Sequence, residues 1–155
     1  MALPDRSGAS SQEGGANACM TGKTPAQESS HAGNVTPMEA FAGLAEGGVL
    51  VDVRTPPEWQ QGVPDLAKTQ GRLVMLSWKL LPEYMVNPDF AQQFAAEKGI
   101  GKDTPLYFMC KGGGRSLEAS TAMAKLGYRR CFNILGGFEG RPDQPGWKTQ
   151  LPWRL

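Results

Sequence analysis

Short and nearly continuous apolar runs recur along the chain at residues 49–53, 72–78, 105–110 and 131–135. Runs of this length without polar alternation are typical of strands that are buried on both faces of a parallel sheet. Amphipathic stretches lie between them, so the pattern predicts strands that alternate with helices. It therefore predicts an α/β fold with a doubly wound parallel sheet flanked by helices.

Helix signals fill the intervals between these runs. Thr36-Pro37-Met38-Glu39 combines a capping box with proline at the first helical position, which predicts a helix over residues 37–46 that stops at a glycine pair. A second helix should follow Asn87, and a third should run over residues 116–126. The apolar face of the second helix consists of Phe90, Ala91, Phe94 and Ala95.

The first 33 residues differ in composition from the rest of the chain. They are dominated by Ala, Gly, Ser, Gln and Glu and contain few large apolar side chains. Such a segment cannot bury enough surface to offset the entropy that ordering costs. We therefore predict a disordered tail at residues 1–33 and a single domain over residues 34–155.

Composition and charge exclude several classes of function. The 155 residues are 40% hydrophobic, and 16 basic side chains against 15 acidic ones give a formal charge of +1. This balance gives no electrostatic basis for binding nucleic acid, and no apolar run approaches the roughly 20 residues that span a membrane. An odd number of cysteines, three, indicates a reducing compartment, so a cytoplasmic location is expected.

Candidate chemistry lies directly after the third apolar run. The segment consists of Cys110, Lys111, Gly112, Gly113, Gly114, Arg115 and Ser116, and it leads into the third predicted helix. Backbone N–H groups converge in such a turn, and the start of a helix favours negative charge. Ligands of doubly wound sheets bind beyond the carboxyl ends of the strands, where Cys110 falls. We therefore predict a nucleophilic cysteine whose thiolate is stabilised by this loop.

These residues resemble a known family, the single-domain rhodaneses, which are thiosulfate sulfurtransferases. The resemblance covers residues 34–155 and depends most on the spacing Cys-x-x-Gly-x-Arg-Ser between a strand and a helix. The segments that carry it are Val51-Asp52-Val53-Arg54 with Glu58-Trp59, the Cys110 loop, Asn133-Ile134-Leu135-Gly136-Gly137-Phe138, and Trp147 with Leu151-Pro152-Trp153. It implies a five-stranded parallel sheet of order 3-2-4-5-1 and a persulfide on Cys110.

One segment departs from the family's pattern. Gly62-Val63-Pro64 stands where the family usually has Gly-His-Ile, which leaves His31 in the predicted tail as the chain's single histidine. No Cys-His pair is therefore expected within the domain. The thiolate would be generated by the backbone amides, the helix dipole, Lys111 and Arg115.

The resemblance predicts two chemical steps and their partners. Cys110 takes the outer sulfur of thiosulfate or a similar small sulfur anion, and the amides of residues 111–116 hold the persulfide. A thiol, cyanide, a sulfur-carrier protein or a redox protein then accepts the sulfur. Lys111 and Arg115 attract the anionic donor, and Asp52 and Arg54 support the surrounding loops. No cofactor and no metal are expected, because the Cys and His residues have no ligand-like spacing.

Two other functions are compatible with the sequence. A phosphatase or arsenate reductase of related fold also uses a cysteine in a backbone cradle, but it has five residues between Cys and Arg, and here there are four. The domain could also be a non-enzymatic regulatory or docking module. The apolar residues of the connecting segment, Trp78, Leu81, Tyr84 and Met85, either line the entrance to the site or cover the core.

Overall fold

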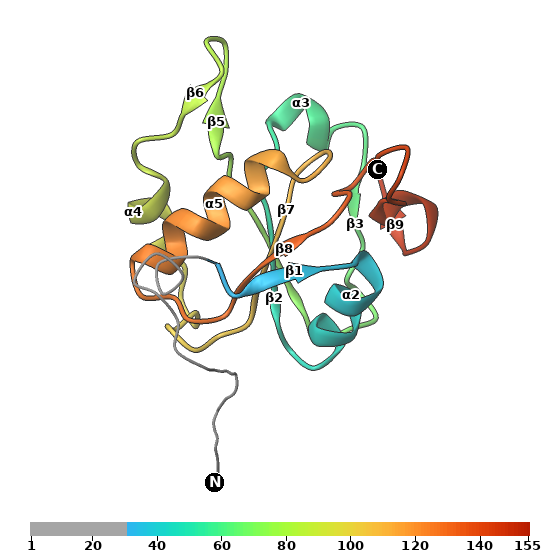
Figure 1. Ribbon diagram of the computed structural model, residues 1–155, viewed down its shortest axis with the longest axis horizontal. Coiled ribbons are helices and arrows are strands. Elements are labelled where there is room, and N and C mark those ends of the chain that lie inside the picture. The colour runs from blue at the N-terminus through green and yellow to red at the C-terminus, as the bar shows by residue number, and fades with distance from the viewer. Residues whose placement is uncertain (1–30) are drawn as a thin grey trace, which may run out of the picture. The chain divides into compact units, whose positions relative to one another are not determined.

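The computed structural model describes residues 31–155, so most of the predicted tail lies outside the described residues (Figure 1). The fold is built on five parallel strands in the order β1-β8-β7-β2-β4. The strands are β1 (Gly33–Val35), β2 (Val49–Asp52), β4 (Arg72–Met75), β7 (Leu106–Met109) and β8 (Cys131–Ile134). Counted in chain order within this sheet, the order is 1-5-4-2-3, which is the predicted 3-2-4-5-1 taken from the opposite edge. The predicted fold class is confirmed.

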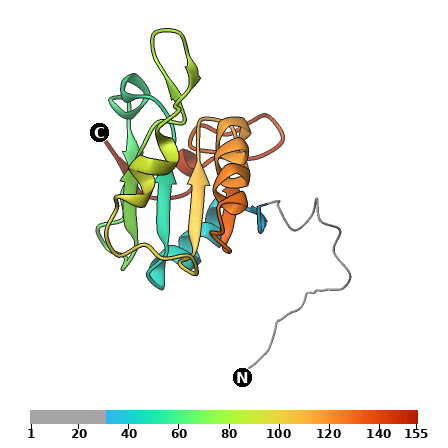
Figure 2. The ribbon, with the colours of Figure 1, turned by 90° about the vertical axis from the view of Figure 1, so that its left-hand side faces the viewer.

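Helices cover both faces of the sheet (Figure 2). On one face lie α4 (Phe90–Ala95) and α5 (Gly114–Lys125), and on the other lies α2 (Pro37–Ala45). Each face has its own apolar core. The first includes Val51, Phe90, Phe94, Phe108, Cys110 and Met123, and the second includes Ala40, Leu44, Met109, Phe138 and Trp147. All four residues of β2 and of β7 are buried, as their nearly continuous apolar pattern predicts, and the buried residues include Asp52 at the end of β2.

Local sequence signals set the ends of the helices. The hydroxyl of Thr36 accepts from the amide of Glu39, and the Glu39 carboxylate accepts from the amide of Thr36, so the predicted capping box starts α2. The third predicted helix, α5, begins at Gly114 instead of Ser116, because Gly113 takes the N-cap position with φ of 119°. The first helical turn therefore includes Arg115.

Several short elements were not predicted. They are β1, whose first residue Gly33 falls in the predicted tail, α3 (Pro56–Trp59), the antiparallel pair β3 (Val63–Pro64) with β9 (Trp153–Arg154), the hairpin of β5 (Lys79–Leu80) with β6 (Met85–Val86), and a 3-10 helix (Trp147–Thr149). The hairpin projects from the body of the molecule near α3 (Figures 1 and 2). Leu81, Tyr84 and Met85 are exposed there, so the alternative that they cover the core is wrong for these three residues. Trp78 does pack against the core, with its ring 5.1 Å from that of Phe90.

The last residues of the chain close the second core. Trp147 is fully buried, and its indole N–H donates to the carbonyl of Pro152 over 2.7 Å. The same carbonyl accepts from the amide of Asp65 over 3.0 Å, which ties the end of the chain to the segment after β3. The C-terminal segment is thus a structural part of the domain.

Parallel pairing brings the functional segments together at the carboxyl ends of the strands. Asp52 of β2 lies opposite Met109 of β7, so the chain leaves both strands at the same level. Cys110 follows β7 directly, and α3, the hairpin and the start of α5 lie at this end of the strands (Figures 1 and 2). Within residues 31–155 no helix has the length and apolar character needed to cross a membrane.

Candidate active site

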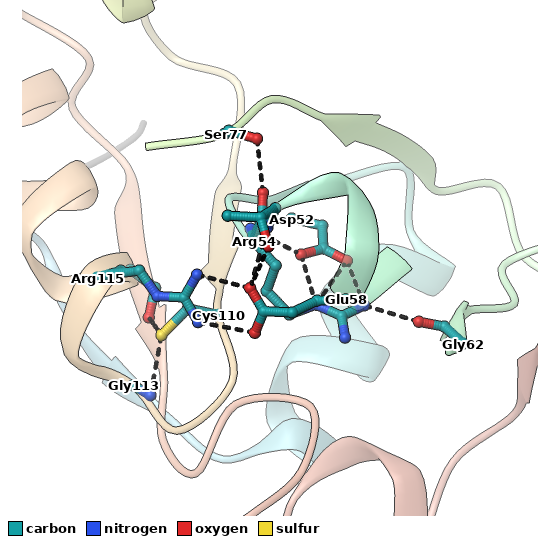
Figure 3. Close-up of polar contacts among 10 residues, drawn as sticks. Asp52, Arg54, Glu58, Gly62, Ser77, Cys110, Gly113 and Arg115 are labelled. Atoms are coloured by element: carbon teal, nitrogen blue, oxygen red, sulfur yellow. Dashed lines mark hydrogen bonds and ion pairs between the residues drawn. The ribbon is translucent and has the colours of Figure 1, made fainter. Parts of the chain in front are cut away.

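The sulfur of Cys110 lies at the start of α5, within hydrogen-bond distance of two donor groups (Figure 3). The amide of Gly113 donates to it over 3.0 Å, and the hydroxyl of Ser116 lies 3.3 Å away. The amides of residues 111–116 were predicted to hold a persulfide. Among them, the Gly113 amide lies within hydrogen-bond distance of the sulfur. The amides after it belong to α5 and are aligned with the helix axis. Only 1% of Cys110 is exposed.

The turn that follows β8 is hydrogen-bonded to the backbone of the cysteine loop. The amides of Phe138 and Glu139 donate to the carbonyls of Cys110 and Lys111 over 2.8 and 3.0 Å. Gly137, which directly precedes Phe138, has a φ of 59°, and a Cβ atom there would lie 2.4 Å from the Cys110 carbonyl oxygen. The Gly-Gly-Phe segment is therefore needed for close backbone approach to the loop.

A chain of polar side chains runs from the sulfur toward the edge of the sheet. The buried Ser116 hydroxyl lies 2.6 Å from the Asn133 side-chain oxygen, and the amide nitrogen of Asn133 donates to Asn34 over 3.3 Å. His31 contacts the same Asn34 oxygen over 3.0 Å. Ser116 has one hydroxyl proton, which either Asn133 or the sulfur can accept, so Asn133 competes with Cys110 for it. Sequence reasoning assigned no role to Asn133, although a buried amide within an apolar strand was a usable signal.

Arg115 is engaged by a carboxylate from α3. Its two terminal nitrogens donate to the two oxygens of Glu58 over 2.8 and 2.9 Å, and its guanidinium lies 5.6 Å from the ring centre of Tyr84. Burial alone would raise the pKa of Glu58, but hydrogen bonds from Arg115 and from the Thr55 amide and hydroxyl lower it to about 2. Burial would likewise lower the pKa of Arg115, yet Glu58 and the nearby Cys110 raise it above its ordinary value.

Asp52 and Arg54 form a separate ion pair that is almost completely buried. The Arg54 guanidinium donates to both Asp52 oxygens over 2.9 and 2.8 Å and lies 4.3 Å from the ring centre of Phe138. The Arg54 carbonyl accepts from the Ser77 hydroxyl over 2.8 Å. These contacts connect the end of β2 to the loops around it (Figure 3). Lys111, the remaining predicted cation of the loop, is exposed.

Residues 36–141 match the sequence model of the family described as the rhodanese-like domain. The chain belongs to the rhodanese-like domain family. This confirms the resemblance that the cysteine loop and the Gly-Gly-Phe segment indicated.

Individual relatives agree with this assignment. An uncharacterized protein of Rickettsia conorii is 38% identical over 112 residues, which cover 71% of this chain and 85% of the relative. Thiosulfate sulfurtransferase GlpE of Haemophilus influenzae is 26% identical over 106 residues, with 68% and 84% covered. The crystal structure of Rv0390 from M. tuberculosis is 34% identical, has a TM-score of 0.71, and covers 81% of this chain and 98% of its own.

The segment in which this rhodanese-like domain departs from the family's pattern is held firmly. The Gly62 carbonyl accepts from the Arg54 guanidinium over 2.9 Å, and Val63 and Pro64 pair with β9. A Cβ atom on Gly62 would lie 2.8 Å from the ring of Trp153, so this glycine also allows close packing. The C-terminal strand therefore fixes the loop that lacks the usual histidine.

The second described cysteine lies in a different environment. Cys131 is fully buried in β8, and burial raises the pKa of its thiol to about 12. A thiol in such a site remains protonated and inert near neutral pH. Among residues 31–155, no group of three or more His, Cys, Asp or Glu side chains is arranged to hold a metal ion.

A cavity of about 360 Å³ borders the cysteine loop on the side of β1 and β8. The glycines of the loop form one wall, and the opposite wall comes from the segment after β8. Its polar side chains are Asn34, Asn133, Arg141, Asp143 and Gln144. The arrangement can therefore support a small polar ligand close to the loop backbone.

Proposed function

We propose that this rhodanese-like domain is a sulfurtransferase that carries sulfane sulfur as a persulfide on Cys110. The observation that supports this most directly is the placement of the Cys110 sulfur, which accepts from the Gly113 amide and adjoins the Ser116 hydroxyl at the start of a 12-residue helix. These groups stabilise negative charge on sulfur. The relative named thiosulfate sulfurtransferase supports the same reaction class.

The proposed reaction consists of two displacements. The Cys110 thiolate attacks the outer sulfur of thiosulfate, and the sulfur–sulfur bond of the donor breaks as sulfite leaves with the electron pair. The product is a persulfide anion on Cys110. A thiophile then attacks the outer sulfur, and the Cys110 thiolate leaves, which restores the starting enzyme. Cyanide, a small thiol, or the thiol of a redox or sulfur-carrier protein in the cytoplasm can act as acceptor.

No general base is required for this exchange. The Gly113 amide donates to the sulfur, the start of α5 favours negative charge there, and sulfite leaves as an anion that needs no proton. Both steps therefore proceed without a histidine beside the cysteine. In the structure, the side chains of Ser116, Asn133 and Asn34 lie between the Cys110 sulfur and His31.

Access to the sulfur requires a small movement of the loop. Only 1% of Cys110 is exposed, so the atoms that cover the sulfur must shift before the outer sulfur of a donor can reach it. Glycines at positions 112 and 113 allow such a movement because their backbones are less restricted than those of other residues.

Intact mass spectrometry tests the proposal. Incubation with thiosulfate should add one sulfur atom, about 32 Da, to the wild-type chain, and cyanide should remove it. Cys110→Ala should gain no mass, whereas the control Cys131→Ala should behave as the wild type. Sulfur bound in Cys110→Ala, or no added sulfur in the wild type with any sulfane donor, would contradict the proposal. The second outcome would favour the alternative of a non-enzymatic docking module.

A further inference from the structure

The charge of Arg115 is balanced within the protein before any donor binds. Both terminal nitrogens of its guanidinium donate to Glu58, and the central carbon of the group lies over the ring of Tyr84, 5.6 Å from the ring centre. A guanidinium has five N–H donors, and the bidentate contact uses two of them in the geometry that would otherwise bind an anionic donor. Arg115 therefore offers an incoming anion much less than a free guanidinium would.

Glu58 keeps its negative charge at all pH values near neutrality. Its side chain is about one quarter exposed, at 26%, and it accepts from Thr55 as well as from Arg115. These donors hold the pKa of the carboxyl at about 2. The Glu58–Arg115 pair consequently has no net charge when the sulfur reacts.

The other charged side chains around the loop add little positive potential. Asp52 and Arg54 form a closed pair whose members are 0% and 1% exposed. Lys111 is exposed to water, which screens its charge. Arg141, which lies beside Gly112, is also exposed, and its guanidinium is 3.9 Å from the Asp143 carboxylate, so its charge is screened by water and partly balanced. The groups that favour an anion at Cys110 are thus mainly the Gly113 amide, the Ser116 hydroxyl and the start of α5. These suffice for one negative charge on sulfur, and they compensate a second charge on the donor poorly.

We infer that Glu58 determines which sulfur donors the site accepts, by neutralising Arg115 and so favouring monoanionic organic donors over dianionic thiosulfate. This inference rests on the proposed sulfur transfer and names its donor class as organic thiosulfonates and hydropersulfides. With a thiosulfonate, the Cys110 thiolate attacks the outer sulfur and a sulfinate leaves with the electron pair. With the anion of a hydropersulfide, the same attack expels a thiolate. Each reaction leaves the persulfide anion on Cys110 and needs no other reactant.

Two donors that differ in charge test this inference. Benzenethiosulfonate is a monoanion and thiosulfate a dianion, and kcat/KM for each is measured with cyanide as acceptor and divided by the uncatalysed rate of the same donor. The wild type should prefer benzenethiosulfonate. Glu58→Gln should reduce this preference by about tenfold through a lower KM for thiosulfate, because removing one charge near the donor affects a dianion more than a monoanion. The change should shrink at high ionic strength.

Two further variants separate charge from structure. Glu58→Asp keeps the charge and should keep the wild-type preference, even if its shorter side chain lowers both activities. Asp103→Asn changes the net charge equally at an exposed site in the segment before β7, and it should also keep the preference.

Three outcomes would overturn the inference. They are a wild type that does not prefer the monoanion, a Glu58→Gln variant with both activities changed in the same proportion, and an Asp103→Asn variant that shifts the preference as much as Glu58→Gln. The second outcome would show that Glu58 only positions Arg115. If Glu58→Gln does not fold, the wild-type preference alone decides. A wild type that forms no Cys110 persulfide with either donor would instead refute the proposed function itself.

Discussion

Single residues of the cysteine loop differ in what the structure requires of them. Gly113 has a φ of 119°, a conformation that side-chain-bearing residues rarely adopt, although a Cβ atom there would meet nothing closer than 3.8 Å. Gly114 has an ordinary helical backbone with open space around it. The first glycine is therefore required for conformation and the second is not.

Alanine at these two positions should have opposite effects on stability. Gly113→Ala should lower the free energy of unfolding by about 1–2 kcal/mol because it forces a strained backbone. Gly114→Ala should be neutral or raise it by up to about 1 kcal/mol, since alanine favours the helical state. Urea denaturation of both variants measures the difference. Equal losses would show that the loop tolerates neither side chain for a reason other than φ.

The residues around the sulfur could be predicted only in part. Cys110, Gly113 and Ser116 are close in sequence, so a strand–loop–helix pattern brings them together. The partner of Arg115 is Glu58, which is 57 residues away. A contact over that separation depends on how α3 and α5 are placed on the sheet, and no local pattern contains that information.

At the scale of elements, the Glu58–Arg115 pair joins α3 to the first turn of α5. The pKa of Glu58 is lowered from 4.5 to about 2, so the folded state binds this proton less tightly than the unfolded chain does. The pair therefore stabilises the fold fully above pH 4.5, and its contribution is lost as the pH falls toward 2.

Acid denaturation should reveal this contribution. At pH 7 Glu58→Gln should lower the free energy of unfolding by about 1–2 kcal/mol, because the group is only partly shielded from water. The difference between wild type and variant should disappear as the pH approaches 2. Denaturant titrations at several pH values measure it. A difference that stays constant with pH would mean that packing, and not charge, accounts for the loss.

Elements of four or more residues with a clear period were predictable, and the shortest ones were not. The runs that became β2, β4, β7 and β8 are nearly continuous and apolar, and the helix caps are local. In contrast, β3 and β9 have two residues each and pair across most of the domain. Their formation depends on tertiary contacts, since two residues carry no periodic signal. The hairpin of β5 and β6 has exposed apolar side chains, which sequence reasoning could equally assign to a core.

At the scale of the whole molecule, the chain beyond the family match completes the fold. The match ends at residue 141, yet Trp147 and Leu151 belong to the second core and the Pro152 carbonyl accepts two hydrogen bonds. The segment also carries β9, which pairs with β3. The C-terminal residues therefore support the loop around Gly62.

Truncation should expose this dependence. Removal of residues 151–155 uncovers the Trp147 ring and leaves its N–H without the Pro152 carbonyl, which should cost about 2–4 kcal/mol and lower Tm by roughly 8 °C or more. Removal of Leu155 alone, which is 83% exposed, should leave Tm unchanged. Thermal unfolding followed by circular dichroism distinguishes the two. An unchanged Tm in the longer truncation would show that the segment does not stabilise the domain.

Within residues 31–155, the sheet divides the interior into two compartments that have no buried residue in common. Substitutions placed in opposite compartments should therefore combine with simple additivity, while pairs within one compartment should not. The core on the α2 side is therefore a suitable place for stabilising substitutions. Stabilising changes around Leu44 or Trp147 can be accumulated there to offset destabilising changes introduced beside the reactive sulfur, without altering the packing of α5 that presents it.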